Sequence, residues 1–496
     1  MATSTRAPKA KNLLPYDGLR GWIKKLEELG DLRTVEGADC AKGIGQATEL
    51  LQHHTDAPSV LFDKIPGYKE GFRVLVNMYG TPARMALTHG LPTDLKKGPL
   101  SQAILQLVEK TKPIPYEFVD EGPVLENVQI GDDVNVDIFP SPRWHERDGG
   151  NYIGTGSYDI TRDPDTGLAN LGTYRVMSMD KKTVGFYISP GKHGRIDREK
   201  YWAKGEPCPA LIVVGGDPLL LVGGCMELPY GLCEYDWVGG LRGAPYPVIK
   251  GRVTGLPIPF DAEIVFEGFV EENNKRIEGP FGEWTGYYAS GAREEPCMDI
   301  KAVYYRNNPI VTGFPPQVPP DEQQRFRAIQ RSALLQEELG KASVPGIVQC
   351  WCHEAGGARM LVAVSIKQMY AGHSRQAGHV AAMCHVGAYA GRYVVVVDED
   401  IDVTSLEDVM WAVSTRSDPA TSIDIIPRAW STPLDPRIDP KDKASGKPMN
   451  SRAVIDATRP WEWRDKFPPV NRPSKEWRAE SEKNWGWVTE RVAKKK

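Results

Sequence analysis

Three features of the sequence predict a multidomain protein of mixed α/β and β structure. Short apolar runs alternate with helical patterns near both ends of the chain, and strand-like runs separated by turns fill its middle. A proline cluster followed by a helical pattern separates the middle from the C-terminal part. With 496 residues, of which 41% are hydrophobic, the chain is long enough for two to four domains with buried cores. We therefore expect an N-terminal α/β unit, a central antiparallel β-barrel and a C-terminal α/β domain.

The N-terminal unit, residues 1–115, is expected to open with an amphipathic helix. Apolar residues repeat at helical spacing after a candidate N-cap at Asp17 and up to a stop at Gly30. They are Leu19, Trp22, Ile23, Leu26 and Leu29. Apolar runs typical of strands follow at 59–62 and 72–76, and the proline-rich stretch 112–115 ends the unit.

The central domain, residues 116–320, is expected to be a mostly antiparallel barrel that begins with a meander. Turn signals at 163–167 and 180–183 separate three strand-like runs. The strands expected in the meander are 153–162, 171–179 and 184–189. Further strands are expected at 210–215, 247–253, 262–267 and 298–305.

A linker helix, residues 321–342, is expected to connect the barrel to the C-terminal domain, residues 343–455. A cap at Asp321 follows the proline cluster, and helical spacing continues to Gly340. The strands expected in the C-terminal domain are 347–352, 360–366 and 394–397, and the helices lie within 375–390 and at 406–413. The charged, Trp-containing residues 456–496 indicate an arm that contacts another subunit.

Composition excludes several classes of function. The 61 Lys and Arg against 65 Asp and Glu leave a net charge of -4, and the one run of basic residues is Lys494 to Lys496, so neither nucleic acid nor an anionic membrane is an expected partner. The longest apolar region, 210–224, contains Asp217 and Pro218 and falls short of the roughly 20 residues that span a bilayer. Since the N-terminus lacks the apolar stretch of a secretory signal, we expect a cytoplasmic protein.

The cysteines do not predict a metal or disulfide framework. The 8 cysteines are spread along the chain without zinc-type spacing, so reduced thiols are expected. Cys350 and Cys352 could bind a soft metal, but their alternation with Val348 fits a buried strand better.

The most informative motif is Glu278-Gly-Pro-Phe-Gly-Glu283, in which a Gly/Pro turn holds two carboxylates apart. The flanking rings of Phe281 and Trp284 can exclude water and raise the pKa of a carboxyl group toward that of a working proton donor. The alternative interpretation of this acidic turn is a solvated loop.

A second motif, Asn170-x4-Arg175, places an amide and a guanidinium on one expected strand. The planar guanidinium of Arg175 matches a carboxylate in a two-point pair, although an ion pair at the protein rim is the simpler interpretation. Residues five apart point to opposite faces of a regular strand, so both can line one pocket only if the strand bulges, and Gly172 is the candidate for that bulge.

Two further motifs lie in glycine-rich segments. His193 ends Pro190-Gly-Lys-His193, in an expected loop after the third meander strand, and Glu234 begins Glu234-Tyr-Asp236. Taken singly, His193 is an ordinary packed or surface histidine and Glu234 a helix cap. Together with Asn170 they form an N/O ligand set suited to Mn²⁺ or Mg²⁺.

These four motifs, in this order and at these separations, resemble those of the UbiD family of reversible decarboxylases. The similarity extends from the N-terminal helix to residues 394–400. It implies a split-barrel central domain that binds prenylated FMN, which a UbiX-type prenyltransferase supplies. It also implies a homodimer or a dimer-based hexamer.

The resemblance assigns roles to individual residues. It implies Mn²⁺ (or Mg²⁺) ligands at Asn170, His193 and Glu234, and a K⁺ held near Leu171, Gly223, Gly224 and Met226 with Glu234 shared between the two ions. Cofactor contacts are implied for Tyr174, Arg175, Lys192 and Lys367, the two lysines at the flavin phosphate. The catalytic network would be Arg175, Glu278 and Glu283, and the substrate pocket would include Pro315, Gln317 and Trp430.

The implied reaction is the non-oxidative, reversible decarboxylation of an aromatic, heteroaromatic or α,β-unsaturated acid. Loss of CO₂ leaves a carbanion that needs an electron sink, which the flavin provides. Arg175 would orient the substrate carboxylate, Glu278 would hold Arg175, and Glu283 would protonate the carbon.

Two alternatives remain at this point. The first is a flavin-free, metal-dependent hydrolase or lyase that uses His193, Glu234 and Asp236 around a catalytic ion. The second is a non-catalytic scaffold subunit with the same fold, against which the intact Arg175, Glu278 and Glu283 argue.

Overall fold

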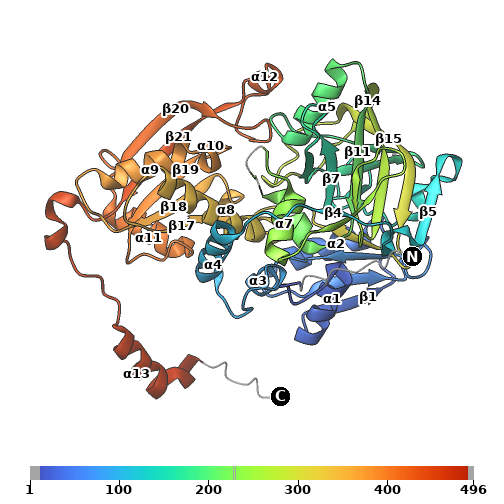
Figure 1. The fold of residues 1–496 in the computed structure, drawn as a ribbon. Helices are drawn as coiled ribbons and strands as arrows, with labels where there is room; N and C mark the ends of the chain where they lie inside the picture. Colours follow the sequence, from blue (N-terminus) through green and yellow to red (C-terminus); the bar gives the residue numbers. More distant parts are fainter. Residues whose placement is uncertain (1–11, 227, 229–230, 490–496) are drawn as a thin grey trace, which may run out of the picture.

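The computed structural model describes residues 12–226, 228 and 231–489, and it forms three bodies and a C-terminal arm (Figure 1). The N-terminal and central bodies pack together, and helix α8 (Glu322–Lys341) lies between them and the C-terminal body. The multidomain mixed α/β and β architecture expected from the sequence is therefore confirmed.

The N-terminal body is a four-stranded sheet with helices against it. Its strands, in spatial order, are β1 (Leu32–Glu36), β2 (Ser59–Asp63), β3 (Arg73–Val76) and β16 (Ile310–Gly313). Its helices are α1 (Gly18–Leu29), α2 (Gly43–Gln52), α3 (Pro82–Thr88) and α4 (Lys97–Lys110). The sequence did not predict β16, which pairs in parallel with β3 although it follows the whole central sheet in the chain. The expected boundary at residue 320 thus leaves one strand of this sheet within the central residue range.

Helix α1 follows its predicted pattern, with one correction at its start. Leu19, Trp22 and Leu26 are buried, Leu29 at the last turn is 55% exposed, and Gly30 ends the helix in the left-handed conformation (φ 68°). Asp17 occupies the N-cap position, but among the described residues its side chain accepts no capping bond from the helix and instead accepts one from Asn12.

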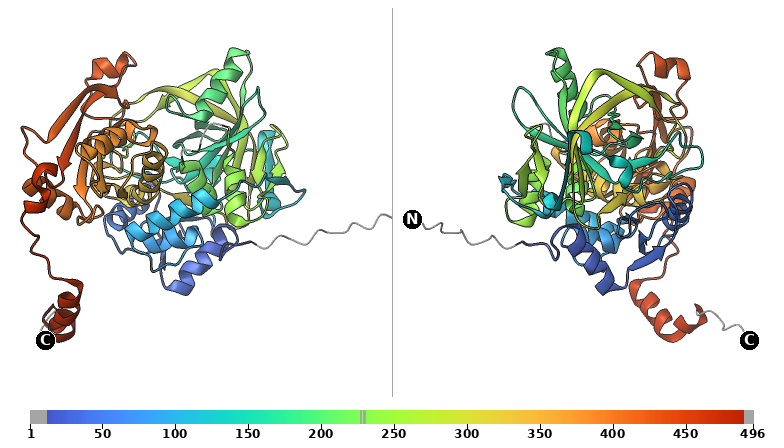
Figure 2. Two further views of the ribbon diagram at one scale, coloured as in Figure 1. Left: turned by 60° about the vertical axis from the view of Figure 1, so that its left-hand side comes forward. Right: turned by 90° about the vertical axis from the view of Figure 1, so that its right-hand side faces the viewer.

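The central body is a nine-stranded sheet that curls into a half-barrel (Figure 2). The path of the sheet is β6 (Tyr152–Gly154), β9 (Val176–Asp180), β10 (Thr183–Gly185), β15 (Arg293–Tyr305), β14 (Ile264–Glu278), β11 (Cys208–Val214), β7 (Ser157–Arg162) and β8 (Ala169–Gly172), with β5 (Asn127–Ile130) pairing β15. A small sheet of β13 (Pro257–Pro259), β12 (Pro247–Lys250) and β4 (Glu117–Phe118) lies beside it. The predicted antiparallel barrel is therefore present as an open half-barrel.

The predicted meander is wrong in its connectivity. Each of the first two expected strands is broken, so that 153–162 becomes β6 and β7, and 171–179 becomes β8 and β9. Strands β7 and β8 pair at one end of the sheet, whereas β9 pairs with β6 and β10 toward the other end. The third expected strand is only the short β10, because the chain then leaves the sheet.

The break between β8 and β9 decides where the site lies. Residues 173–175 cross the opening of the half-barrel, from Gly172 at the end of β8 to Val176 at the start of β9. Gly172 thus ends a strand and does not form the predicted bulge. Because Asn170 and Arg175 lie on opposite sides of the break, the alternation of a single strand does not constrain them.

Three helices cover the half-barrel near its opening: α5 (His193–Ala203), α6 (Pro218–Cys225) and α7 (Glu234–Arg242). His193, expected in a loop, is the first residue of α5, and Glu234 is the first residue of α7. The N-termini of both helices therefore lie at predicted site residues.

Helix α8 confirms the predicted linker helix. Asp321 accepts a bond from the backbone N–H of Gln324, and the Gln324 side chain accepts one from the backbone N–H of Asp321, which is a capping box. The helix ends one residue beyond Gly340.

The C-terminal body is a five-stranded sheet with helices packed on it. Its strands, in spatial order, are β17 (Ile347–Cys352), β18 (Leu361–Ile366), β19 (Tyr393–Asp398), β21 (Met449–Ala457) and β20 (Ile423–Trp430), and its helices include α9 (His373–Met383), α10 (His385–Ala388), α11 (Leu406–Arg416) and α12 (Pro440–Ala444). The sequence did not predict β20 and β21. Cys350 and Cys352 are buried in β17, as the strand interpretation predicted.

The arm ends in helix α13 (Lys475–Trp485), which stands away from the three bodies (Figures 1 and 2). None of its residues is buried, and Trp477 is 69% exposed. Across the described residues, no helix is both long enough and apolar enough to cross a membrane.

Candidate active site

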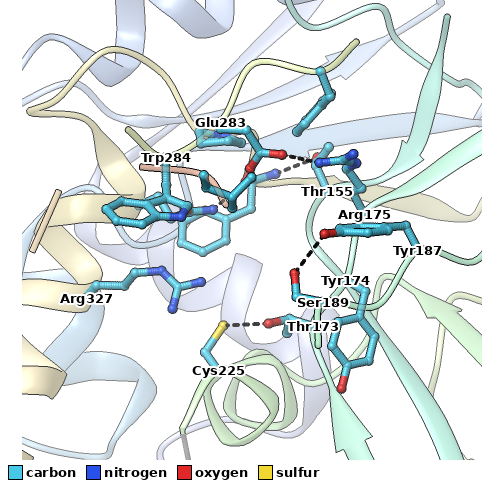
Figure 3. A pocket seen from close by; sticks show the side chains of 15 residues that line it. Thr155, Thr173, Tyr174, Arg175, Tyr187, Ser189, Cys225, Glu283, Trp284 and Arg327 are labelled. Carbon is cyan, nitrogen blue, oxygen red and sulfur yellow. Dashed lines mark hydrogen bonds and ion pairs between the residues drawn. The ribbon is translucent and has the colours of Figure 1, made fainter. Parts of the chain in front are cut away.

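Two adjoining cavities lie between the half-barrel, helix α8 and the C-terminal body. The first, here called the Arg175 cavity, has a volume of about 150 Å³ (Figure 3). The second, here called the Asn170 cavity, has a volume of about 270 Å³. They share one wall, formed by Thr173, Tyr174, Ser189, Cys225, Trp284, Arg327 and Leu434. The segment 173–175 that crosses the barrel opening thus lies where the cavities meet.

A buried ion-pair group lies at the Arg175 cavity, and two of its members, Arg175 and Glu283, form part of the cavity wall. Arg175 donates to both oxygens of Glu278, from Nε to Oε1 and from Nη2 to Oε2, at 2.8 Å each. Its Nη1 donates to Oε1 of Glu283. The side chains of Arg175, Glu278 and Glu283 are 9%, 2% and 8% exposed. These burials exclude the rim ion pair and the solvated loop as interpretations of the two motifs.

Aromatic residues fix this group in place. The guanidinium carbon of Arg175 lies 4.6 Å from the ring centre of Tyr187 and 5.5 Å from that of Phe281. The hydroxyl of Tyr152 donates to Oε1 of Glu278 at 2.9 Å. The orientation of the guanidinium is therefore set by three carboxylate bonds and two rings.

The turn between the two glutamates needs its glycines. Gly279 has φ 86°, in the left-handed region that favours glycine. A Cβ on Gly282 would lie 2.8 Å from the His145 ring, and the Gly282 N–H donates to Asp148 at 3.1 Å. The turn is thus packed against the segment that precedes β6.

Burial and the neighbouring charges shift the pKa values of Glu283 and Arg175. Burial raises the pKa of Glu283, the Arg175 charge opposes this shift, and the Glu278 carboxylate adds to it. For Arg175, burial lowers the pKa, but the two carboxylates outweigh it and the net shift is upward. Arg175 therefore keeps its charge, and Glu283 holds its proton to higher pH than an ordinary glutamate.

The Asn170 cavity brings together the predicted metal ligands. Asn170, His193 and Glu234 all line it. Glu234 accepts the N–H of Leu171 at 2.9 Å, and burial raises its pKa to about 7. A cation beside this buried carboxylate would offset the cost of its charge, so the set fits a divalent ion of the hard type. Among the described residues, no three or more His, Cys, Asp or Glu side chains are grouped so that they could hold a metal ion. The set in this cavity differs from such a group because it consists of one His, one Glu and the amide of Asn170.

The same cavity has features of an anion site. Ser189, Pro190, Gly191 and Lys192 line it beside His193, at the N-terminus of α5. Helix N-termini and lysines attract phosphate groups. A ligand with a phosphate at one end therefore fits the Asn170 cavity. Of the residues assigned to K⁺, Leu171, Gly224 and Met226 line this cavity, and Gly223 does not.

Lys367 is placed away from both cavities. It directly follows β18 and lines a separate cavity of the C-terminal body together with Gln368, Asp398 and Arg459. It does not line the Asn170 cavity, and its assignment to the flavin phosphate stays a prediction.

The predicted substrate residues lie in different places relative to the two cavities. Phe314 and Pro316 line the Arg175 cavity, whereas Pro315 and Gln317 do not. Successive side chains of an extended segment point to opposite sides, which explains this alternation, and the roles of Pro315 and Gln317 stay predictions. Trp430 lines the Asn170 cavity, not the Arg175 cavity, and its ring packs edge-on against Tyr389 with centres 5.4 Å apart.

Sequence reasoning missed several residues of the Arg175 cavity. Tyr187 and Cys225 carry no motif of their own. Gln323 and Arg327 also line this cavity, and they lie four residues apart in α8, so they share one helix face. This spacing could have been recognised in the sequence as a polar face of the helix.

The open half-barrel carries a buried carboxylate–guanidinium–carboxylate group beside the Arg175 cavity. The adjoining Asn170 cavity is lined by an amide, an imidazole and a carboxylate. Adjoining cavities with convergent polar groups of this kind are typical of an enzyme active site. The chain matches the models of the N-terminal, Rift-related and C-terminal domains of 3-octaprenyl-4-hydroxybenzoate carboxy-lyase over residues 23–97, 117–319 and 325–457. The protein belongs to the UbiD family of carboxy-lyases, as the four motifs predicted.

Relatives and solved structures agree with this membership. The pyrrole-2-carboxylic acid decarboxylase of Pseudomonas aeruginosa is 31% identical over 456 residues, which cover 89% of this chain and 91% of that one. The structure of the vanillic acid decarboxylase of Sedimentibacter hydroxybenzoicus in its open form superposes with a TM-score of 0.82 at 29% identity, covering 96% of this chain and 99% of that one.

A further structural neighbour contains a flavin. The UbiD-class enzyme HmfF from Pelotomaculum thermopropionicum, solved in complex with FMN, superposes with a TM-score of 0.82 at 26% identity, covering 93% of this chain and 98% of that one. An evolved dimeric form of the same enzyme was solved in complex with prFMN.

Proposed function

We propose that the protein is a non-oxidative, reversible decarboxylase of a single-ring aromatic or heteroaromatic acid, and that it uses prenylated FMN. The observation that carries this proposal is the buried Arg175, held between Glu278 and Glu283 on the wall of the Arg175 cavity. Such a group binds a carboxylate beside an acid that can deliver a proton.

The size and lining of the Arg175 cavity support a single-ring substrate. Its volume of about 150 Å³ is that of a cavity that accepts one benzene ring. Phe281, Trp284, Phe314 and Pro316 give it flat apolar walls. The name of the Pseudomonas relative, which acts on pyrrole-2-carboxylic acid, agrees with a ring of this size.

The Asn170 cavity supports the cofactor assignment. Lys192 and the N-terminus of α5 would hold the phosphate, together with Mn²⁺ or Mg²⁺ on Asn170, His193 and Glu234. A K⁺ would lie near Leu171, Gly223, Gly224 and Met226. Tyr174, on the shared wall, would contact the flavin. When bound, prenylated FMN supplies the electron sink for the carbanion that CO₂ leaves behind.

The protein's residues then perform binding and proton transfer. Arg175 orients the substrate carboxylate, and Glu278 holds Arg175 through two bonds. The bond between the ring carbon and the carboxylate carbon breaks, and CO₂ departs. Glu283 gives its proton to the ring carbon and becomes a carboxylate, which solvent reprotonates before the next turnover. In the reverse direction, Glu283 accepts the proton.

The proposal includes two partners. A UbiX-type prenyltransferase would supply the cofactor, and a second copy of the chain would contact the exposed arm around α13 to form a homodimer or a dimer-based hexamer. The proposed location is the cytoplasm.

The test is a spectrum followed by an activity screen. The protein, co-expressed with a UbiX-type prenyltransferase and kept from light and oxygen, is expected to carry a flavin absorbance and to release CO₂ from at least one acid in a panel of single-ring aromatic and heteroaromatic acids. A flavin-free protein with metal-dependent hydrolase or lyase activity would support the first alternative. A flavin-free protein without activity would support the scaffold alternative.

A further inference from the structure

Arg327 is a charged residue of the Arg175 cavity for which the mechanism above has no use. It lies on α8, is half-buried and belongs to the wall shared by the two cavities. Among residues 12–226, 228 and 231–489, its side chain makes no hydrogen bond, ion pair or cation–π contact. Its guanidinium therefore lines a cavity and has no partner in the part of the chain that the structure describes.

Other arginines of the same helix are bonded. Arg325 donates to the carbonyl oxygen of Gly80 at 2.8 Å, and Arg331 donates to that of Val386 at 2.6 Å. These two side chains hold α8 against its neighbours. Arg327 differs from them because it contributes no such bond to the fold, and a half-buried cation without a partner costs free energy. This cost is offset if a ligand supplies the partner.

The residues around Arg327 indicate which chemical group of the ligand would contact its guanidinium. Gln323 lies one helical turn earlier on the same face, and Trp284, Phe314 and Leu434 form apolar walls. Among the described residues, the one carboxylate that lines the Arg175 cavity is Glu283, and it is bonded to Arg175. A guanidinium beside an amide and apolar walls binds a planar acidic group, with two parallel N–H bonds to a carboxylate.

The position of Arg327 separates it from the reacting end of the substrate. Figure 3 shows Arg327 reaching into the cavity from one side, while Arg175 and Tyr187 lie on the other. Arg175 and Glu283 mark the end from which CO₂ would leave. A group on the same ring that meets Arg327 is therefore a second substituent.

We propose that Arg327 binds a second acidic group of the substrate, so that the preferred substrates are single-ring acids with two carboxylates, of which one is lost at Arg175 and the other is held by Arg327. This inference rests on the proposed decarboxylase function. Arg327 thereby selects the substrate and takes no part in proton transfer.

The test measures binding, with pyrrole-2-carboxylate and pyrrole-2,5-dicarboxylate as probes. Isothermal titration calorimetry is performed on the FMN-loaded protein and on the flavin-free protein. The wild type is expected to bind the dicarboxylate about tenfold or more tightly than the monocarboxylate. Arg327→Gln is expected to lose this preference, with less than about a twofold change for the monocarboxylate, and Arg327→Lys to keep part of it.

Lys341→Gln is the matched control, because Lys341 lies on the same helix, its side chain is 69% exposed and the charge change is the same. The control is expected to bind both probes as the wild type does. All four proteins are expected to retain FMN equally. The inference is overturned if the wild type shows no preference, if Arg327→Gln weakens both probes equally, or if Arg327→Gln loses FMN, which would assign Arg327 to the cofactor.

Different results would contradict the proposed decarboxylase function. It fails if the wild type retains no flavin or releases no CO₂ from any acid after loading with prenylated FMN. In that case the titration of the flavin-free protein still measures whether Arg327 selects the dicarboxylate. The wild type could instead retain flavin and release CO₂ but show no preference for the dicarboxylate that depends on Arg327. That result would contradict this inference and leave the proposed function intact.

Discussion

Arg175 and Glu278 form a two-point ion pair, in which both bonds are 2.8 Å long and the carboxylate is 2% exposed. Oε1 of the same carboxylate also accepts the hydroxyl of Tyr152. Glu283 meets Arg175 through one nitrogen, and among the described residues its side chain has no other hydrogen-bond partner. Glu278 is thus held rigidly, and Glu283 is the member with freedom to exchange a proton.

Glu283→Gln is expected to retain flavin and to lose turnover by about 100-fold or more, because the amide fills the same space but cannot donate a proton to carbon as an acid does. Arg175→Ala should have a similar effect. Flavin absorbance and CO₂ release of each purified variant are the measurements. Near-normal decarboxylation by either variant would contradict the assigned roles.

The pH dependence of turnover follows from the raised pKa of Glu283. Burial raises this pKa, so the protonated form that the decarboxylation needs persists to higher pH than for an ordinary glutamate. The rate is expected to be full below this pKa and to fall as the pH rises through it. The rate is measured from pH 5 to pH 9. A rate that rises over the same range would show that the carboxylate form of Glu283 is the one required.

Tyr152→Phe is expected to reduce kcat about 5- to 20-fold with a smaller change in KM, because the bond that positions Glu278 is lost while the ring remains. The loss of stability should be about 1 kcal/mol. Steady-state kinetics and a thermal melt measure the two effects. Tyr288→Phe removes a hydroxyl bonded at 3.1 Å to the backbone N–H of Arg147 and serves as the control. Equal kinetic effects in both variants would argue against the positioning role of Tyr152.

Metal removal is expected to release the flavin. Asn170, His193 and Glu234 would anchor the cofactor phosphate through the ion, so a chelator should give a colourless protein after desalting, and Mn²⁺ should restore binding. His193→Ala should lose flavin likewise. His379→Ala, at an ion pair with Asp424 in the C-terminal body, is the control. Unchanged flavin absorbance in His193→Ala would exclude His193 as a ligand.

Stability is expected to fall as the pH rises, because of Glu322 at the start of α8. This buried carboxyl accepts bonds from Tyr79 N–H and the Gln52 amide, and burial raises its pKa to about 7. The folded state keeps the proton that the unfolded state loses above its ordinary pKa of about 4.5. Glu322 therefore stabilises the folded state fully below pH 4.5. This stabilisation, about 3 kcal/mol, is lost as the pH rises to about 7.

Thermal melts between pH 5 and pH 8.5 check this dependence. Glu322→Gln should flatten the fall in Tm, since the amide has no proton to lose in this range. Glu28→Gln, at an exposed position of α1, should leave the dependence unchanged. An equally steep fall in Glu322→Gln would assign the effect to other groups.

The predictable parts of the structure were those encoded by neighbouring residues. Helix α1 with its stop at Gly30, helix α8 with its cap at Asp321, and the acidic turn from Glu278 to Glu283 all follow from local periodicity and turn chemistry. The errors concern partners that lie far apart in the chain. The sequence of β16 does not reveal that it pairs with β3, and nothing local ends β8 at Gly172.

The candidate site divides in the same way. The motifs singled out Arg175, Glu278, Glu283 and the ligand set with Asn170 as candidates, because the chemistry of each of these side chains can be recognised in isolation. Lys367 lines a different cavity from the predicted ligand set, and a lysine next to a strand gives no information about which cavity that strand borders. Arg327 was missed, because a charged residue on a helix is ordinarily a solvated one.

The sequence by itself determined which chemical groups are available: the acids, the guanidinium, the amide and imidazole, and the helices and turns that hold them. The tertiary structure alone decided which groups meet, because the crossing at residues 173–175 and the packing of α8 on the half-barrel depend on contacts between residues that are remote in the chain. Burial follows from those contacts. It is burial that raises the pKa of Glu283 and leaves Arg327 facing a cavity.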